Sequence, residues 1–179
     1  KDKFMKKVAV ILAEGFEEIE ALTSVDVLRR AGAIASIVGL NDVNIKGCHN
    51  ICVKADVTLR EMKELDYDAI VLPGGLPGAS NLANDTRLKA ILQNFDKSNK
   101  LICAICAAPM VLESAGVLKD HFVCYPGFEE NVRSDKRGYM SDKNVLKDQN
   151  IITGKGPAFS MEFALFIVKN LLGDEAYLK

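Results

Sequence analysis

Cys106 is the first residue whose type and position could do chemistry. It stands in LICAICAAPMVLESAG (101–116), where an apolar run ends and a helix is predicted to begin near Ala107. The free N–H groups and the positive dipole end of that helix would favour the thiolate, which is nucleophilic and sensitive to oxidation. Pro109 suits the first helical turn. The alternative is an inert cysteine buried in the core.

The sequence LPGG (72–75) predicts backbone donors for the same site. Gly74 and Gly75 follow a buried strand, and paired glycines let the backbone approach a ligand closely. The N–H groups of Gly75 and Ala107 could then form an oxyanion hole. The alternative is an ordinary tight turn.

Three glutamates, Glu17, Glu18 and Glu20, open the first predicted helix. On a helical wheel Glu17 and Glu20 fall on or beside the apolar face, whereas Glu18 falls on the polar side with Arg29. A carboxylate beside a buried face needs a partner, and a cysteine thiol would serve. The pattern favours Glu20 as that carboxylate. Solvated first-turn glutamates are the alternative, more strongly for Glu17 and Glu18.

The other cysteines give no comparable signal. The spacing Cys103-x-x-Cys106 suits a redox disulfide only if both thiols lie at a helix start, and strand alternation predicts that these two lie on opposite faces. Cys48-His49 and Cys52 are close in sequence, but no second cluster of matching spacing completes a zinc site. We therefore expect no redox disulfide, no metal and no cofactor.

Composition limits the class of protein. The chain has 179 residues, of which 49% are hydrophobic and 26% charged, enough for one domain with a sizeable core. A net charge of −1 does not call for nucleic acid, and no apolar run approaches the roughly 20 residues that cross a membrane. Five cysteines without an export signal predict free thiols and a cytoplasmic location. Met5 is the expected natural start, with residues 1–4 left over from cloning.

Apolar runs alternate with helix-like patterns along the chain. This predicts a single α/β domain over residues 1–179, with a largely parallel sheet and helices on both faces. Ligands in such folds bind beyond the carboxyl ends of the strands, where AEGFEE, LPGG and AICAAP should converge. The expected strands are 7–13, 34–40, 51–57, 67–75, 101–105, 121–125 and a hairpin over 145–153; the expected helices are 14–32, one within 79–95, one from 107 and 157–173.

Taken together, these segments resemble the DJ-1/ThiJ/PfpI superfamily, most closely its DJ-1 and YajL branch. The matching segments are AEGFEEIEAL, VDVLRRAG, DAIVLPGG, AICAAP and GKGPAFSMEFALFIVKNLLG, which together with the stretches between them span nearly all of the chain. The resemblance implies a flavodoxin-like sandwich, usually dimeric, with a cysteine in a strained nucleophile elbow. Cys106 matches that cysteine, and Glu20 matches the protonated glutamate that hydrogen-bonds it. Gly75 and Ala107 match the backbone donors.

The sequence departs from the family at several positions. Tyr125 stands where DJ-1 has a histidine, which excludes a Cys–His dyad of that kind. Ala107 replaces the histidine of the protease branch, which weakens a peptidase interpretation. His49 stands near the position of a pocket arginine, and 156–159 reads G-P-A-F in place of G-P-G-T. We expect Gly74, His49 and Tyr125 to line the substrate site.

The resemblance leaves two functions of different class open. In the first, Cys106 adds to the aldehyde carbon of a small 2-oxoaldehyde such as methylglyoxal, and Glu20 moves protons to give lactate, a glyoxalase- or deglycase-type activity without a cofactor. In the second, Cys106 is oxidised to a sulfinate and signals in a protective or chaperone role. An amidotransferase-like hydrolase would need His121, which begins a predicted strand. The expected partners are the aldehyde and a second copy of the chain.

Overall fold

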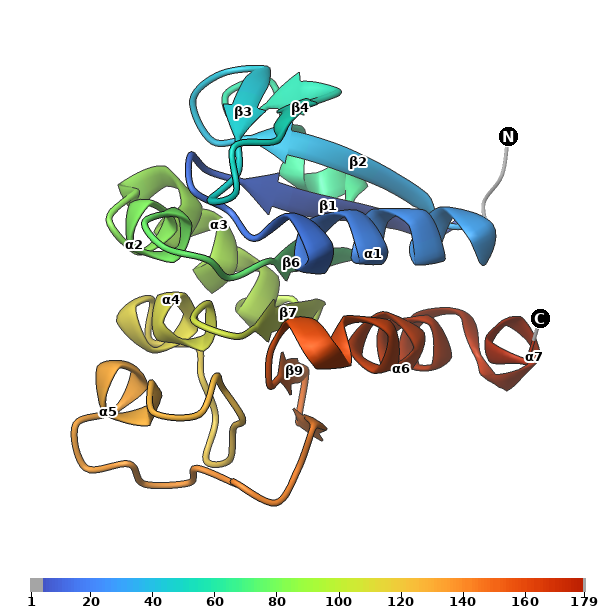
Figure 1. Cartoon of the computed structure of the whole chain (residues 1–179). Helices are drawn as coiled ribbons and strands as arrows, with labels where there is room; N and C mark the ends of the chain where they lie inside the picture. Colours follow the sequence, from blue (N-terminus) through green and yellow to red (C-terminus); the bar gives the residue numbers. More distant parts are fainter. Residues whose placement is uncertain (1–4, 179) are drawn as a thin grey trace.

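The computed structural model describes residues 5–178 and is built around a seven-stranded sheet in the order β5-β2-β1-β6-β7-β9-β8 (Figure 1). Every pairing in it is parallel except that of β8 with β9. The predicted α/β fold with a largely parallel sheet is therefore confirmed. The expected cloning remnant, residues 1–4, lies outside the described residues. The strands are β1 (Lys7–Leu12), β2 (Ile34–Gly39), β5 (Val57–Thr58), β6 (Ala69–Leu72), β7 (Leu101–Ile105), β8 (Val145–Asp148) and β9 (Ile151–Gly154), and β3 (Asn44–Lys46) pairs with β4 (Cys52–Lys54) in a separate hairpin.

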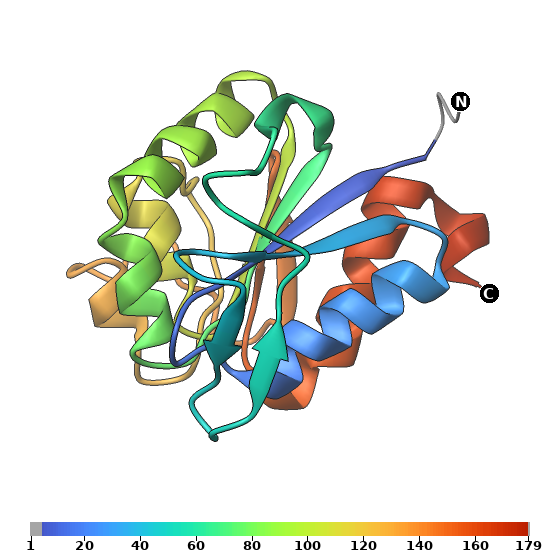
Figure 2. The same cartoon turned by 90° about the horizontal axis from the view of Figure 1, so that it is seen from above.

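Helices cover both faces of the sheet, as Figure 2 shows. Two long helices, α1 (Glu18–Arg30) and α6 (Ser160–Leu172), pack together on one face. The opposite face is covered by α2, α3 and α4. In the part of the chain that the structure describes, no helix is long and apolar enough to cross a membrane. The remaining helices are α2 (Gly78–Ala83), α3 (Thr86–Lys97), α4 (Pro109–Ser114), α5 (Glu129–Val132), α7 (Asp174–Tyr177) and the 3-10 turns Glu64–Asp66 and Pro157–Phe159.

The position of strand β1 in the sheet explains why its sequence is almost entirely apolar. Val8, Val10 and Leu12 belong to the apolar cluster under α1 and α6. Ala9 and Ile11 belong to the cluster under α3 and α4. Successive side chains alternate between two covered faces, so both sets are buried. The strand is a rigid platform for the loop that follows it.

The site lies where the strand order reverses. β1 and β6 are neighbours, and the sheet extends outward from them through β2 on one side and β7 on the other. In open α/β sheets, ligands bind at the carboxyl ends of the strands at such a switch point. The loops after β1 and β6 and the turn after β7 meet there. These are the segments AEGFEE, LPGG and AICAAP.

Several predicted boundaries are wrong for local reasons. Helix α1 begins at Glu18 rather than at residue 14, because the Glu17 carboxylate caps it by accepting the Glu20 N–H. The helix predicted within 79–95 is two helices, α2 and α3. The Asp85 carboxylate caps the start of α3 by accepting the N–H groups of Arg87 and Leu88. Helix α4 begins at Pro109, not at Ala107.

Two of the predicted strands are also corrected. Residues 121–125 form no strand, because Phe122 makes only an isolated bridge to Tyr139. The single strand expected over 51–57 is split between β4 and β5, which pair with different partners. The hairpin over 145–153 is confirmed as β8 and β9.

Candidate active site

Cys106 occupies a constrained turn directly after β7. Its φ of 66° lies in the left-handed region, which costs a non-glycine residue about 1–3 kcal/mol. The turn is held from both sides, because the Cys106 N–H donates to the Gly154 carbonyl at 3.0 Å and the Cys106 carbonyl accepts the Tyr125 N–H at 3.0 Å. The residue is only 9% exposed. This is the strained elbow that the family resemblance implies.

Both expected backbone donors lie beside the Cys106 sulfur. The N–H groups of Gly75 and Ala107 interact with the sulfur and act to lower its pKa. Gly74 lets this approach happen, because a Cβ there would stand 2.6 Å from the Cys106 Cβ and 2.9 Å from the Ala107 nitrogen. Gly75 has a φ of 90°, a conformation that favours glycine. The LPGG turn is therefore shaped by close contact with the cysteine.

Glu20 lies buried next to the Cys106 thiol and is 1% exposed. Its Oε1 accepts the Gly74 N–H at 3.0 Å, whereas its Oε2 completes no hydrogen bond with the described residues. Burial, followed by the negative charge of Glu17, raises the pKa of Glu20 to about 8, against the lowering effect of the Gly74 N–H and the Cys106 thiol. The carboxyl is therefore mainly protonated at neutral pH, and Oε2 is the oxygen left to carry the proton.

The Cys106 thiol is less acidic than the sequence predicts. Burial raises its pKa, and negative charge on Glu20 raises it further, which outweighs the N–H groups of Ala107 and Gly75. The helix predicted to start near Ala107 starts at Pro109, and the Ala107 N–H still reaches the sulfur. A protonated Glu20 removes the charge repulsion and offers the sulfur a donor. Thiol and carboxyl thus form one coupled acid–base pair.

The alternative that Glu17 and Glu18 are solvated does not hold. Both are buried, because the loop between β3 and β4 folds over the start of α1. Glu18 accepts the backbone N–H groups of His49 at 2.9 Å and Ile51 at 3.2 Å. Burial raises the pKa of Glu18, but these hydrogen bonds outweigh it, so the net shift of its pKa is downward. A helical wheel considers one helix in isolation, so it cannot predict that a distant loop covers the polar side of that helix.

His49 lies in that loop, and its side chain is 70% exposed. Its contacts are with Glu18 (Nδ1 to Oε1, 3.2 Å), Glu17 (Nδ1 to Oε1, 3.6 Å) and the sulfur of Cys48 (3.3 Å). Burial and the charges of Glu18 and Glu17 raise the pKa of Cys48 to about 11. The sequence analysis missed this group, because its members are about 30 residues apart in the chain.

Tyr125 is half-exposed beside the Cys106 turn. It borders a cavity of about 210 Å³ whose other walls come from Pro126 and residues 155–159. A Cβ added at Gly156 would stand 3.0 Å from the Tyr125 ring. This places Tyr125 and the G-P-A-F segment along one approach to the turn. The roles of Tyr125, His49 and Gly74 in binding substrate stay predictions.

His121 lies near the end of the strands opposite to the one that Cys106 follows. Its ring is 3.5 Å from the carboxylate of Asp148, which pairs with Ile151 at the start of β9. Cys106 follows the opposite, carboxyl end of β7. Their separation supports the sequence argument against a hydrolase based on these two residues.

Cys103 and Cys106 both contribute to the apolar cluster under α1 and α6, although strand alternation predicted opposite faces. Alternation fails because β7 ends at Ile105, before Cys106 turns. Neither forms a disulfide, and each of the five cysteines is free in the structure.

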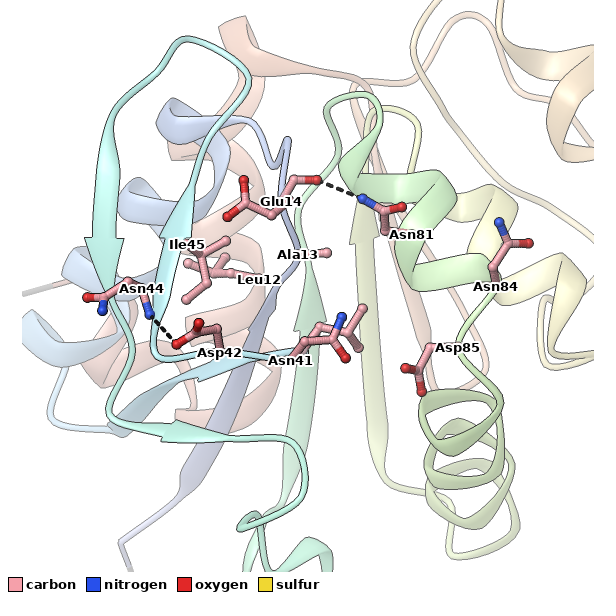
Figure 3. Close-up of a pocket in the computed structure, with 11 residues that line it drawn as sticks. Leu12, Ala13, Glu14, Asn41, Asp42, Asn44, Ile45, Asn81, Asn84 and Asp85 are labelled. Atoms are coloured by element: carbon pink, nitrogen blue, oxygen red, sulfur yellow. Dashed lines mark hydrogen bonds between the residues drawn. The ribbon is translucent and has the colours of Figure 1, made fainter.

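A second hollow, of about 280 Å³, lies beyond the ends of β1 and β2 (Figure 3). Two of its polar side chains form hydrogen bonds with neighbouring backbone groups: Asp42 accepts the Asn44 N–H, and Asn81 donates to the Glu14 carbonyl. Asp85 accepts the Arg87 guanidinium as well as capping α3. These groups shape the loops around the hollow, and sequence spacing did not indicate it.

Comparison with known proteins defines the class of this chain. A family model described as the DJ-1/PfpI family matches residues 6–170. The chain is 38% identical over 173 residues to "Parkinson disease protein 7 homolog" of Danio rerio, covering 95% of this chain and 92% of that protein. It is 36% identical over 172 residues to "Glutathione-independent glyoxalase DJR-1.2" of Caenorhabditis elegans, covering 95% and 91%. The crystal structure of Drosophila melanogaster DJ-1beta matches with a TM-score of 0.93 and 36% identity, covering 98% of this chain and 95% of that one.

The chain therefore belongs to the DJ-1/PfpI family, as its motifs predicted. Its fold is that of the DJ-1 structures, with the expected flavodoxin-like α/β arrangement.

Proposed function

We propose that this protein converts small 2-oxoaldehydes such as methylglyoxal to 2-hydroxy acids without a cofactor. The observation that carries the proposal is the buried carboxyl of Glu20, with a pKa near 8, beside the sulfur of Cys106. A general acid–base group works best when its pKa lies near the working pH. The relative named as a glutathione-independent glyoxalase supports the same reaction class.

The proposed reaction begins with addition to the aldehyde. The Cys106 sulfur bonds to the aldehyde carbon, the thiol proton passes through Glu20 to the oxygen, and a hemithioacetal forms. While negative charge develops on that oxygen, the N–H groups of Gly75 and Ala107 stabilise it. This step uses the thiol form of Cys106, so it does not require a resting thiolate.

Proton transfer between carbons completes the conversion. Once Glu20 has released its own proton to solvent, its carboxylate removes the proton from the hemithioacetal carbon. The hydroxyl proton moves to the oxygen of the neighbouring carbonyl, and Glu20 then delivers the abstracted proton to that neighbouring carbon. The product is a thioester of Cys106, which one water hydrolyses to lactate and the free thiol. The sum is methylglyoxal plus water giving lactate and a proton, with no net redox change.

The experiment is an assay of methylglyoxal loss and lactate formation by reduced protein, with a chelator present and no cofactor added. Wild type is compared with Cys106→Ser and Glu20→Gln. Loss of turnover in both variants, with their folds intact by circular dichroism, supports the proposal. An absence of lactate from folded, reduced wild type would overturn it for this substrate. The remaining candidate would then be redox sensing through a Cys106 sulfinate, detectable as a 32 Da mass increase from two added oxygens.

We also propose that the chain forms a homodimer. Large apolar side chains are exposed near the start of α1 and on the adjoining loop, at Ile19, Leu22 and Ile51. Surface of this kind often marks a contact between proteins. Sedimentation velocity should give twice the monomer mass, and Ile19→Glu should shift the protein toward monomer. A monomeric wild type at assay concentration would contradict this proposal.

A further inference from the structure

A cluster of potential metal ligands lies outside the Cys106 turn. It consists of Glu17 and Glu18 at the start of α1 and of Cys48 and His49 in the loop between β3 and β4. One ligand atom from each of the four lies within 4.8 Å of all the others. Thiolate, imidazole and carboxylate are the ligands that zinc takes in proteins.

The distances within this cluster resemble the edges of a zinc tetrahedron. Bonds of about 2.3 Å to sulfur and about 2.0–2.2 Å to nitrogen and oxygen place neighbouring ligand atoms about 3.3–3.7 Å apart. His49 Nδ1 is 3.3 Å from the Cys48 sulfur, 3.2 Å from Glu18 Oε1 and 3.6 Å from Glu17 Oε1. The Cys48 sulfur is 3.5 Å from Glu18 Oε1. These four distances lie within or just below the expected range.

The backbone holds the loop in this position. The Cys48 N–H donates to the Phe16 carbonyl at 2.8 Å, and the His49 N–H donates to the Glu18 carboxylate at 2.9 Å. Gly47 lets the loop close over that carboxylate, because a Cβ there would stand 2.4 Å from the Glu18 Cδ. Preorganised ligands lose little conformational freedom when a metal binds.

Charge also favours a cation in this cluster. Among residues 5–178, the only basic side chain within ion-pair distance of the buried carboxylates of Glu17 and Glu18 is that of His49. Glu17 Oε2 caps α1, which leaves its Oε1 facing His49. An ionised carboxylate has about four acceptor sites, so Glu18 can bind a metal and keep its backbone hydrogen bonds. The exposed side chain of His49 gives the ion a route from solvent.

We propose that Glu17, Glu18, Cys48 and His49 bind one divalent metal ion of the zinc class in tetrahedral geometry. Binding displaces the proton of the Cys48 thiol to solvent, so the sulfur coordinates as a thiolate. The proposal is independent of turnover at Cys106. It also differs from the expectation of no metal, which considered only spacing along the sequence.

Cobalt(II) is the probe, because tetrahedral cobalt with a thiolate ligand gives an intense charge-transfer band in the near ultraviolet. Reduced, full-length protein is titrated with cobalt(II) and then with zinc(II). We expect one cobalt per chain, the thiolate band, and loss of the band when zinc displaces cobalt. Wild type without a saturable thiolate band would overturn the proposal.

Cysteine variants assign the site. Cys48→Ser should lose the thiolate band and bind zinc more weakly by at least the roughly 10–100-fold that loss of an outer-shell partner costs, and His49→Gln should weaken zinc binding similarly. Cys52→Ser is the matched control, because Cys52 is an exposed, free cysteine on the neighbouring strand, and it should keep the band. Cys106→Ser should also keep it. A band that survives in Cys48→Ser, or that disappears in Cys106→Ser, would place the metal elsewhere and overturn the proposal.

Discussion

Two cysteine–glutamate pairs lie against the first turns of α1, and their carboxyl groups differ in protonation. Cys106 faces Glu20, while Cys48 lies 3.5 Å from Glu18. Both glutamates are buried. The Glu20 side chain accepts one backbone N–H and has a raised pKa, whereas that of Glu18 accepts the N–H groups of His49 and Ile51 and has a lowered pKa.

Low solvent exposure alone therefore does not decide the charge of a carboxyl. Burial penalises both ionised forms, most strongly that of Glu20, which lies deep in the protein, whereas Glu18 lies near the surface beside the exposed His49 and its N–H donors outweigh the smaller penalty. Glu20 is left as a neutral acid that can exchange a proton with a sulfur. Glu18 is left as a carboxylate suited to a cation. A cysteine paired with a glutamate is thus suited to acid–base chemistry at Glu20 and to metal binding at Glu18, although the two glutamates are only two residues apart on α1.

The largest expected effect comes from removing the exchangeable proton of Glu20. Glu20→Gln should lower kcat for methylglyoxal about 10²–10⁴-fold with little change in KM, because the carboxyl acts on protons in the transition state. Steady-state kinetics measures this split. Cys52→Ser, a change at an exposed cysteine, should stay near the wild-type rate. A rise in KM with kcat unchanged would show that Glu20 only positions substrate.

The corresponding change at the second pair acts on metal binding. Glu18→Gln should weaken zinc binding by at least the roughly 10–100-fold that loss of an outer-shell partner costs, because it replaces a charged ligand by a neutral amide of the same shape. Competition against a zinc indicator measures the affinity. An unchanged zinc affinity would show that Glu18 is not a metal ligand, and the proposed contrast between the two cysteine–glutamate pairs would then fail.

Close packing between the turns after β6 and β7 predicts a stability effect. Gly74→Ala should lower the free energy of unfolding by about 1–3 kcal/mol, because its Cβ would collide with Cys106 and Ala107. Urea denaturation measures it. Gly156→Ala is the control, since its Cβ would meet only the half-exposed ring of Tyr125, and its effect should be smaller. Equal losses would contradict the packing argument.

The two glutamates should also change stability with pH in opposite directions. Between pH 4.5 and about 8, the folded state keeps the proton of Glu20 that the unfolded state releases, so this residue makes stability fall with rising pH, by up to about 1.4 kcal/mol per unit. Glu18 has a lowered pKa, so its contribution is present above pH 4.5 and is lost as pH falls through its folded value.

Urea midpoints over pH 3–9, in the presence of a chelator, separate these contributions. Glu20→Gln should flatten the decline between pH 5 and 8. Glu18→Gln should reduce the loss of stability in acid. A Glu20→Gln variant with the wild-type slope above pH 5 would show that Glu20 is ionised in the folded protein.

The sequence predicted most of the sheet, because its signals are local. β1, β2 and β7 are apolar runs of strand length, and a strand covered on both faces requires such a run. Pro109 marks the first residue of α4 for an equally local reason, since it lacks the N–H that a helix start leaves free. The strand predicted over 121–125 failed because pairing depends on a partner far along the chain.

The candidate site likewise has features that the sequence predicted and features that only the structure shows. By itself, the sequence determined the strand–turn–helix junction that carries Cys106, the glycines of LPGG and the acid-rich start of α1, and their motifs indicated the family. Only the tertiary structure decided how each group ionises. It buried Glu17 and Glu18 beneath the loop that carries Cys48 and His49, and left one oxygen of Glu20 without a partner among the described residues. A pKa depends on burial, neighbouring charge and donors from distant segments, and spacing along the chain encodes none of these.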